Sequence, residues 1–251
     1  MLQISISLYS NLRYVFFDKL KYRKYLKKNL ILKNCAKKEI CYILGNGPSL
    51  KNVDISLLKG KDVITVNKSI NTPFFEQLTP KAHIVLDKKI LSSISDDIEL
   101  KLQNNNMSTH FIFHRSGIEQ FKSYRNTFFA YATKMAYPKI KNDMCSNMTT
   151  YLNVLPFAIA CAMYMGYKKI VLLGNDFSFF AARKDQHFYD IEENVKRQES
   201  LYQDLAGCSI VLTEYRNLYK YAKKQGVKIV NATEGSLLDE IPQVNLLDCL
   251  E

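Results

Sequence analysis

The segment Cys41–Leu50 (CYILGNGPSL) constrains the fold of this chain more than any other. Its apolar run stops at Gly45-Asn46-Gly47, and Pro48 stands where a helix could begin. Glycine lets the backbone approach a ligand closely, and proline suits the first turn of a helix. The layout predicts a first β-strand, a tight loop and a helix N-terminus, whose free N–H groups suit a phosphate. Two interpretations remain open: a nucleotide or phosphate site near residue 46, and an ordinary strand–turn–helix without a ligand.

Two familiar nucleotide-binding loops do not match this segment. The dinucleotide fingerprint needs a third glycine where this chain has Leu50, and an acidic residue after the second strand where it has Asn67. The phosphate loop of ATPases ends in Gly-Lys-Ser/Thr, which the segment lacks. The sequence therefore argues against a classical NAD enzyme and against a P-loop ATPase.

Short apolar runs alternate with helical patterns after residue 38. This alternation predicts an α/β fold with a mostly parallel sheet. Ligands bind such sheets at the carboxyl ends of the strands, which favours the loops after Leu44, Val66, Leu86 and Leu173. The predicted strands are Ile40–Leu44, Val63–Val66, His83–Leu86, His110–Phe113, Ile170–Leu173 and Val227–Val230. The predicted helices are the turn after Pro48, Asp96–Gln103, Ile118–Tyr124, Thr149–Met165 with a kink at Pro156, Ile191–Leu205 and Thr213–Gln225. The stretch 126–147 shows no clear pattern and is a candidate for substrate-facing loops.

A second glycine loop follows the strand predicted at Ile170–Leu173. Gly174-Asn175-Asp176 places an amide and a carboxylate at a strand end, where Asp176 can bind ribose, orient a base, coordinate a metal or cap the loop. Eleven residues beyond it, His187 is a candidate general acid or base, or a surface histidine. The other histidines lie in or beside apolar strands and are expected to be structural: His83, His110 and His114.

Residues 146–150 are rich in side chains that cap helices and come just before the apolar part of the helix predicted at Thr149–Met165. Their position at a helix start makes them a candidate for a second anion site. Six cysteines are scattered without a C-x-x-C pair, and no two histidines have the spacing of a metal site. We therefore expect reduced thiols, a cytoplasmic location and no metal site.

Residues 1–38 form a basic, amphipathic extension ahead of a domain predicted at 39–251. The net charge is +11, and nine cations lie between Lys19 and Lys38 after an apolar, aromatic start. Three interpretations remain open: a solvated basic helix packed on the domain, a membrane-surface anchor, and a nucleic-acid arm. Apolar residues beside the cations favour the membrane surface over nucleic acid. No stretch is long enough to span a bilayer, and the N-terminus lacks the features of a secretory signal.

Three segments together resemble one superfamily: residues 43–50 (ILGNGPSL), 165–177 (MGYKKIVLLGNDF) and 231–236 (NATEGS). They resemble bacterial CMP-sialic-acid-dependent sialyltransferases of the lipooligosaccharide type. They look even more like motility accessory factor proteins, which glycosylate flagellin with nonulosonic acids. The archaeal 6-hydroxymethylpterin pyrophosphokinase (MptE-like) family shares this core. The resemblance covers roughly residues 40–240 and implies a single Rossmann-like, doubly wound domain with a lid around residues 178–207.

The resemblance also implies which residues form the site. Gly45, Asn46 and Gly47 would hold the donor phosphate and ribose, and Asn67 would contact the nucleotide. His187 would be the general base and Tyr189 would steady the leaving phosphate, although His187 comes sooner after the second glycine loop than the sialyltransferase base does. The cytidine side would be built from Ser146, Asn147, Thr149, Gly174, Asn175 and Asp176, and aligning the first three of these requires an insertion.

The function implied is an inverting glycosyltransferase that needs no metal and no cofactor besides its CMP-sugar donor. It would transfer a nonulosonic acid of the sialic, legionaminic or pseudaminic type to a cell-surface glycan, such as lipopolysaccharide O-antigen or capsule. It would act peripherally at the inner face of the cytoplasmic membrane through residues 1–38, with no nucleic-acid partner and with a homo-oligomer as an option. Two alternatives remain: a pyrophosphokinase using ATP and Mg²⁺, for which Asp176, Asp185 and Asp190 could cluster, and a non-catalytic nucleotide-binding protein.

Overall fold

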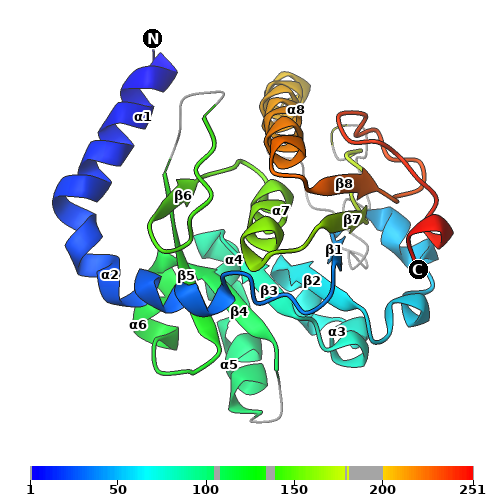
Figure 1. Cartoon of the computed structure of the whole chain (residues 1–251), viewed down its shortest axis with the longest axis horizontal. Helices are drawn as coiled ribbons and strands as arrows, with labels where there is room; N and C mark the ends of the chain where they lie inside the picture. The colour runs from blue at the N-terminus through cyan, green and yellow to red at the C-terminus, as the bar shows by residue number, and fades with distance from the viewer. Residues whose placement is uncertain (1, 105–107, 134–138, 179, 181–199, 251) are drawn as a thin grey trace.

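The computed structural model describes residues 2–104, 108–133, 139–178, 180 and 200–250 (Figure 1). In this part of the chain the strands form one eight-stranded sheet in the order β6-β5-β4-β3-β2-β1-β7-β8. Every ladder in the sheet is parallel, so the predicted α/β, doubly wound fold class is confirmed. The strands are β1 (Ile40–Leu44), β2 (Asp62–Val66), β3 (Ala82–Val85), β4 (His110–His114), β5 (Thr127–Thr133), β6 (Asn147–Thr149), β7 (Lys169–Leu173) and β8 (Lys228–Asn231).

The strand order changes direction between β1 and β7. From β1 the chain adds β2 to β6 on one side, and it then returns to add β7 and β8 on the other side. Two loops therefore leave neighbouring strands at the same edge of the sheet and run in opposite directions. Such a switch in strand order is where open parallel sheets bind ligands.

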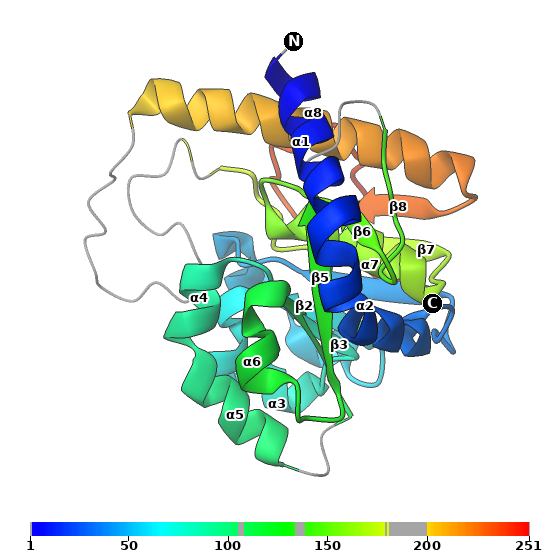
Figure 2. The same ribbon diagram turned by 90° about the vertical axis from the view of Figure 1, so that its left-hand side faces the viewer.

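Helices cover both faces of the sheet, as Figure 1 and Figure 2 show. Because side chains alternate along a strand, Ile43 packs in the core formed with α7 and α8, whereas Tyr42 and Leu44 pack with α3 on the other face. A third cluster joins α4, α5 and α6 to β3, β4 and β5. The helices are α1 (Leu2–Arg13), α2 (Lys19–Lys28), α3 (Pro73–Leu78), α4 (Lys88–Ser93), α5 (Ser95–Gln103), α6 (Ile118–Phe121), α7 (Val154–Met165) and α8 (Leu201–Lys224).

The stretch expected to carry loops, 126–147, instead contains β5 and leads into β6. The sequence of β5 is TFFAYAT, and all but one of its residues are buried. A strand covered on both faces shows no polar alternation, which is why the pattern was missed. The strand β6 has three residues and is defined by its pairing with β5.

The predicted helix Thr149–Met165 was wrong at its start, because α7 begins at Val154. The side chain of Asn153 caps it by accepting a hydrogen bond from the Leu155 N–H group at 2.9 Å. Pro156 therefore lies in the first turn, where its missing N–H group costs nothing. The expectation of a kink at Pro156 is corrected accordingly.

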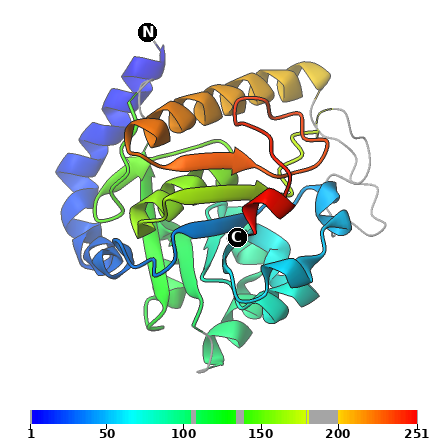
Figure 3. The same cartoon turned by 45° about the vertical axis from the view of Figure 1, so that its right-hand side comes forward.

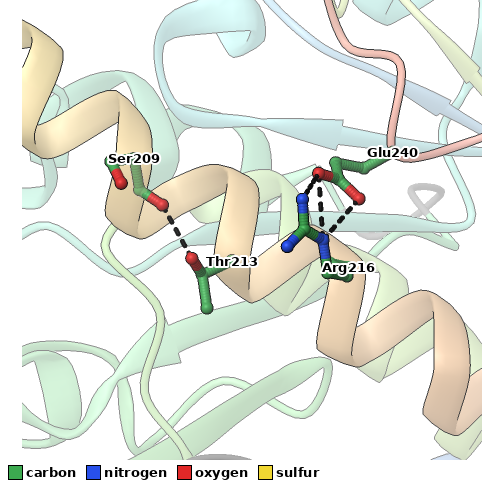
Figure 4. A network of polar contacts seen from close by, with 4 residues as sticks. All are labelled: Ser209, Thr213, Arg216 and Glu240. Carbon is green, nitrogen blue, oxygen red and sulfur yellow. Dashed lines mark hydrogen bonds and ion pairs between the residues drawn. The ribbon is translucent and has the colours of Figure 1, made fainter.

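Helix α8 joins the end of the helix predicted at 191–205 to the helix predicted at 213–225, and residues 191–199 lie outside the described residues. It runs without a break from Leu201 to Lys224 and begins with a capping box formed by Ser200 and Gln203. Figure 3 shows α8 lying alongside β8. A bidentate ion pair between Arg216 of α8 and Glu240 ties the segment after β8 to this helix (Figure 4). That segment also reaches the candidate site described below.

The N-terminal residues follow the outer edge of the sheet beside β5 (Figure 1). A π-helical turn, η1 (Tyr14–Asp18), joins α1 to α2. Leu26 and Leu32 are fully buried, and the Asn29 side chain donates hydrogen bonds to two backbone oxygens of the domain. The second half of the predicted extension therefore contributes to the core. None of the helices described is long and apolar enough to cross a membrane.

Candidate functional site

A cavity of about 520 Å³ opens at the carboxyl ends of the strands. Its lining comes from the loops after β1, β2, β3 and β7, from the ends of β4 and β5, and from the start of α7. The lining includes Asn46, Gly47, Asn67, Asp87, His114, residues 150–155 and residues 174–178. The predicted residues of both glycine loops thus come together at the switch between β1 and β7.

The two glycine loops are in direct backbone contact. The Gly45 N–H group donates to the oxygen of Leu173 at 2.7 Å, and the Gly47 N–H group donates to the oxygen of Gly174 at 2.8 Å. A Cβ atom on Gly45 would lie 2.3 Å from the Gly174 oxygen, and one on Gly47 would lie 1.8 Å from a carboxylate oxygen of Asp176. Both positions therefore require glycine because no side chain fits between the loops.

The side chain of Asp176 also joins the two glycine loops. Its carboxylate accepts hydrogen bonds from the Ser49 N–H group at 2.9 Å and from the Ser49 hydroxyl at 2.8 Å. Of the roles that the sequence left open for Asp176, the structure shows that of a loop cap. The turn predicted after Pro48 is a short 3-10 turn, η3 (Pro48–Asn52).

These contacts limit which backbone groups of residues 45–47 could bind the predicted phosphate. The N–H groups of Gly45, Gly47 and Ser49 all donate within the protein, so they are not free for a phosphate. The cause is the close approach of the two loops, which lets each satisfy the polar groups of the other. The amide side chains of these two loops, Asn46 and Asn175, belong to residues that line the cavity.

Three asparagines that line the cavity each carry an amide atom without a hydrogen-bond partner among the described residues. These atoms are Oδ1 of Asn46, Oδ1 of Asn67 and Nδ2 of Asn175. Asn46 and Asn175 are buried, and buried polar groups are nearly always bonded. An unsatisfied amide in a residue that lines a cavity makes that residue a candidate for contact with a polar ligand. The sequence predicts that all three residues belong to a nucleotide site.

Hydrogen bonds with Tyr215 and with the segment after β8 fix Asn175 in place. The Asn175 N–H group donates to the Thr233 hydroxyl at 3.0 Å, and its side-chain oxygen accepts from the Tyr215 hydroxyl at 3.3 Å. The Ser236 hydroxyl donates to the Asn175 carbonyl oxygen at 2.7 Å. Asn67 has a φ of 54°, in the left-handed region, which asparagine tolerates better than most residues.

The start of α7 faces the cavity and is fixed by a buried carboxylate. The Leu152 N–H group donates to both side-chain oxygens of Glu214, each at 3.0 Å. Residues 150–155 line the cavity, so the N-terminal end of a twelve-residue helix lies beside it. The helix dipole favours a negative charge at this end.

Ser146, Asn147 and Thr149, expected at a helix start, belong instead to β6 and its approach. Asn147 donates to the side chain of Asn11 and to the hydroxyl of Thr133, each at 2.8 Å. Thr149 accepts from the backbone N–H group of Lys141 at 2.9 Å. Ser146, Asn147 and Thr149 are not among the residues that line the cavity, because β6 and its approach lie away from it.

His114 lines the cavity although the sequence analysis treated it as structural. It ends β4, and its Nδ1 atom accepts a hydrogen bond from the Ser116 N–H group at 3.1 Å. Burial, followed by the nearby charges of Arg115 and Lys88, lowers the pKa of His114 to about 4. The ring is therefore neutral at pH 7. Applying the strand-end rule to β4 would have found it.

The remaining predicted residues fall outside the described part of the chain or away from the cavity. His187 and Tyr189 lie outside the described residues, as does most of the region predicted as a lid. His83 is fully buried, and burial lowers its pKa to about 3, in keeping with a structural role. The cysteines are all free thiols.

Comparisons with known proteins agree with this fold. A family model described as "6-hydroxymethylpterin diphosphokinase MptE-like" matches residues 15–181. The chain belongs to the MptE-like family. The match confirms the resemblance to the MptE-like family that the sequence shows. The matched range includes both β1 and the second glycine loop. A comparison with curated protein sequences gave no match.

Solved structures of the sialyltransferase CstII from Campylobacter jejuni share the fold. The complex with the substrate analogue CMP-3FNeuAc has a TM-score of 0.51 at 17% identity, covering 82% of this chain and 86% of that chain. The complex with cytidine-5'-monophosphate has the same TM-score and identity, covering 83% and 86%. The complex with a trisaccharide acceptor and CMP has a TM-score of 0.50 at 17% identity, covering 82% and 85%.

The contact between the glycine loops makes a prediction about stability. Replacing Gly45 by Ala forces a Cβ atom against the backbone of Gly174, and we expect a loss of about 2 kcal/mol or more of unfolding free energy. The matched control is Gly207→Ala in α8, where nothing lies within 4 Å of the added atom. That change replaces a poor helix former and should stabilise the protein by up to about 1 kcal/mol. Denaturant unfolding measures both variants, and a Gly45→Ala variant as stable as the native chain would contradict the contact.

Proposed function

We propose that this chain is a glycosyltransferase that transfers a nonulosonic acid from a CMP-activated donor to a glycan acceptor. The observation that carries the proposal is the set of three unsatisfied asparagine amides, two at the β1/β7 switch and Asn67 after the neighbouring strand β2. Amides donate to and accept from the edge of a base and the hydroxyls of a ribose. The shared fold with CstII, whose complexes hold CMP-3FNeuAc, CMP and a trisaccharide acceptor, supports this choice of donor.

The charge of the cavity also supports a donor with a single phosphodiester. Among the described residues the lining contains amides, hydroxyls and two aspartates, and it contains no Lys or Arg. A triphosphate in such a lining would need a metal ion to offset its charge. A CMP-sugar carries less charge at its phosphate, which we place beside the N-terminal end of α7.

We place the acceptor farther along the sheet edge, toward Asp87 and His114. The nucleotide would contact Asn46, Asn67 and Asn175. The cavity continues from these residues to the ends of β3 and β4. From the sequence alone, His187 is our proposed base. It would take the proton of the acceptor hydroxyl as that oxygen bonds to the anomeric carbon and CMP leaves with its bonding electrons, steadied by Tyr189. The acceptor that we propose is a cell-surface glycan such as O-antigen or capsule.

A diphosphokinase is the second candidate, and the family match favours it. It would bind ATP with Mg²⁺ and transfer a diphosphoryl group. Within the described ranges, no group of three or more His, Cys, Asp or Glu side chains is placed to hold a metal ion. Magnesium would therefore have to be held by Asp87, Asp176 and the triphosphate itself, with Asp176 giving up its bonds to Ser49.

A panel of nucleotides in thermal unfolding separates these candidates. A ligand at about 100 times its Kd adds about 2.7 kcal/mol to stability, which raises the Tm of a chain of this size by several degrees. We expect CMP to give this shift without metal and ATP to give less, with or without Mg²⁺. A shift with ATP and Mg²⁺ but none with CMP would establish the diphosphokinase instead. CMP binding without any release of CMP from a CMP-sugar would identify a non-catalytic binding protein.

Asn46 offers the sharpest single test of the nucleotide site. Asn46→Ala removes a buried amide whose free oxygen we assign to the donor, and we expect the affinity for CMP to fall by about tenfold or more. The matched control is Asn52→Ala, because Asn52 is exposed at the end of η3. Calorimetric titration of both variants gives the ratio of Kd values. Equal affinities in the two variants would remove Asn46 from the site.

A further inference from the structure

Over residues 7–18, whose side chains are described, the helical arm formed by α1 and η1 has a polarity opposite to that of an ordinary surface helix. Surface helices turn their apolar side chains inward. Here Ser7 and Asp18 are buried, and the half-buried Asn11 accepts a hydrogen bond from Asn147 at 2.8 Å. Apart from Arg13, the outward side chains are apolar, and several are among the most exposed large apolar side chains of the described residues. They are Leu8, Tyr9, Leu12, Val15, Phe16 and Phe17 of the arm, followed by Leu20 of α2.

The exposure is large and continuous. Phe16, Phe17 and Leu20 are 71%, 76% and 80% exposed. In η1 the three consecutive residues from Val15 to Phe17 all face solvent, and π-helical turns occur often at functional sites. Exposed apolar patches of this kind mark interaction surfaces. Figure 1 and Figure 2 show α1 on the outside of the molecule, at the β5/β6 edge of the sheet.

Contacts on the inner side fix this orientation of the arm. The Asp18 carboxylate accepts a hydrogen bond from the Tyr131 hydroxyl and pairs with Arg13 at 3.3 Å. The rings of Tyr14 and Tyr131 lie 4.8 Å apart. Turning the arm to bury Phe16 and Phe17 would break these contacts and expose a buried carboxylate. The apolar face must therefore be covered by something other than this domain.

The net charge around the arm favours one kind of partner for its apolar face. Between residues 7 and 33 the chain has eight Lys or Arg residues and one acid, the buried Asp18. The exposed cations of this region are Arg13, Lys19, Lys21, Arg23, Lys24, Lys27 and Lys33. A symmetric contact with a second copy would bring two such cationic surfaces together, which is unfavourable. A bilayer that carries anionic lipid offers both an apolar interior and negative charge.

We propose that the apolar face of the α1–η1 arm, with the cations of α2, docks on an anionic lipid bilayer. Phe16, Phe17 and Leu20 would enter the boundary between headgroups and acyl chains, while Lys24 and Lys27 contact the phosphates. Membrane docking is independent of the cavity chemistry, so its test does not depend on CMP binding.

Co-sedimentation of the full chain with vesicles tests this proposal. We expect binding to vesicles of phosphatidylcholine and phosphatidylglycerol in equal parts, weak binding to phosphatidylcholine alone, and loss of binding at high salt. Phe16→Ser with Phe17→Ser should lower partitioning by about tenfold or more. Lys24→Glu with Lys27→Glu should lower it by a similar factor of about ten.

Matched controls come from exposed residues elsewhere. Leu100→Ser with Leu247→Ser changes two exposed leucines, and Lys223→Glu with Lys224→Glu makes the same change in net charge on α8. Both controls should bind like the native chain, and an unchanged Tm checks folding in every variant. Equal binding by arm variants and controls, or no binding to anionic vesicles, would overturn the proposal. It would also be overturned if light scattering showed a dimer that Phe16→Ser with Phe17→Ser dissociates, because the face would then be an interface between copies.

Discussion

The backbone contact between the two glycine loops is the constraint on which the rest of the site depends. The pairing of β1 with β7 continues past the strand ends through the bonds of Gly45 and Gly47 to residues 173 and 174. No Cβ atom fits between the loops. The contact turns Asp176 toward Ser49 and leaves Asn46 and Asn175 at the cavity. A substitution that separates the loops would therefore disturb the fold and the site together.

The sequence predicts the sheet well where an apolar run ends in a clear signal. The strand β1 was predicted with its observed bounds, and β7 to within one residue, because Gly45 and Gly174 stop both runs. The strand β5 has no such ending and is covered on both faces, so nothing in its pattern separates it from a loop of apolar residues. The strand β6 exists through pairing with β5, which is a long-range contact that local patterns do not show.

The sequence predicts several residues that line the cavity, but it does not predict their hydrogen-bond partners. The three asparagines were expected, because the strand-end rule favours their loops and the resemblance implies that they contact the nucleotide. The hydrogen bonds around these asparagines could not be predicted, because the N–H groups of Gly45 and Gly47 donate to a loop from a distant part of the chain. The polar residues at 146–149 looked like a helix start, but the contact with Asn11 and the pairing with β5 decide their place. In the same way, Tyr131 decides which face of η1 turns inward.

The central claim is that the loop contact at the β1/β7 switch builds a nucleotide site out of asparagine amides. A crystal structure of the chain grown with CMP tests it most directly. We expect a cytidine nucleotide in the cavity, with its polar atoms within hydrogen-bond distance of Asn46, Asn67 and Asn175. An empty cavity at saturating CMP, together with ATP and magnesium bound there in a parallel crystal, would contradict it.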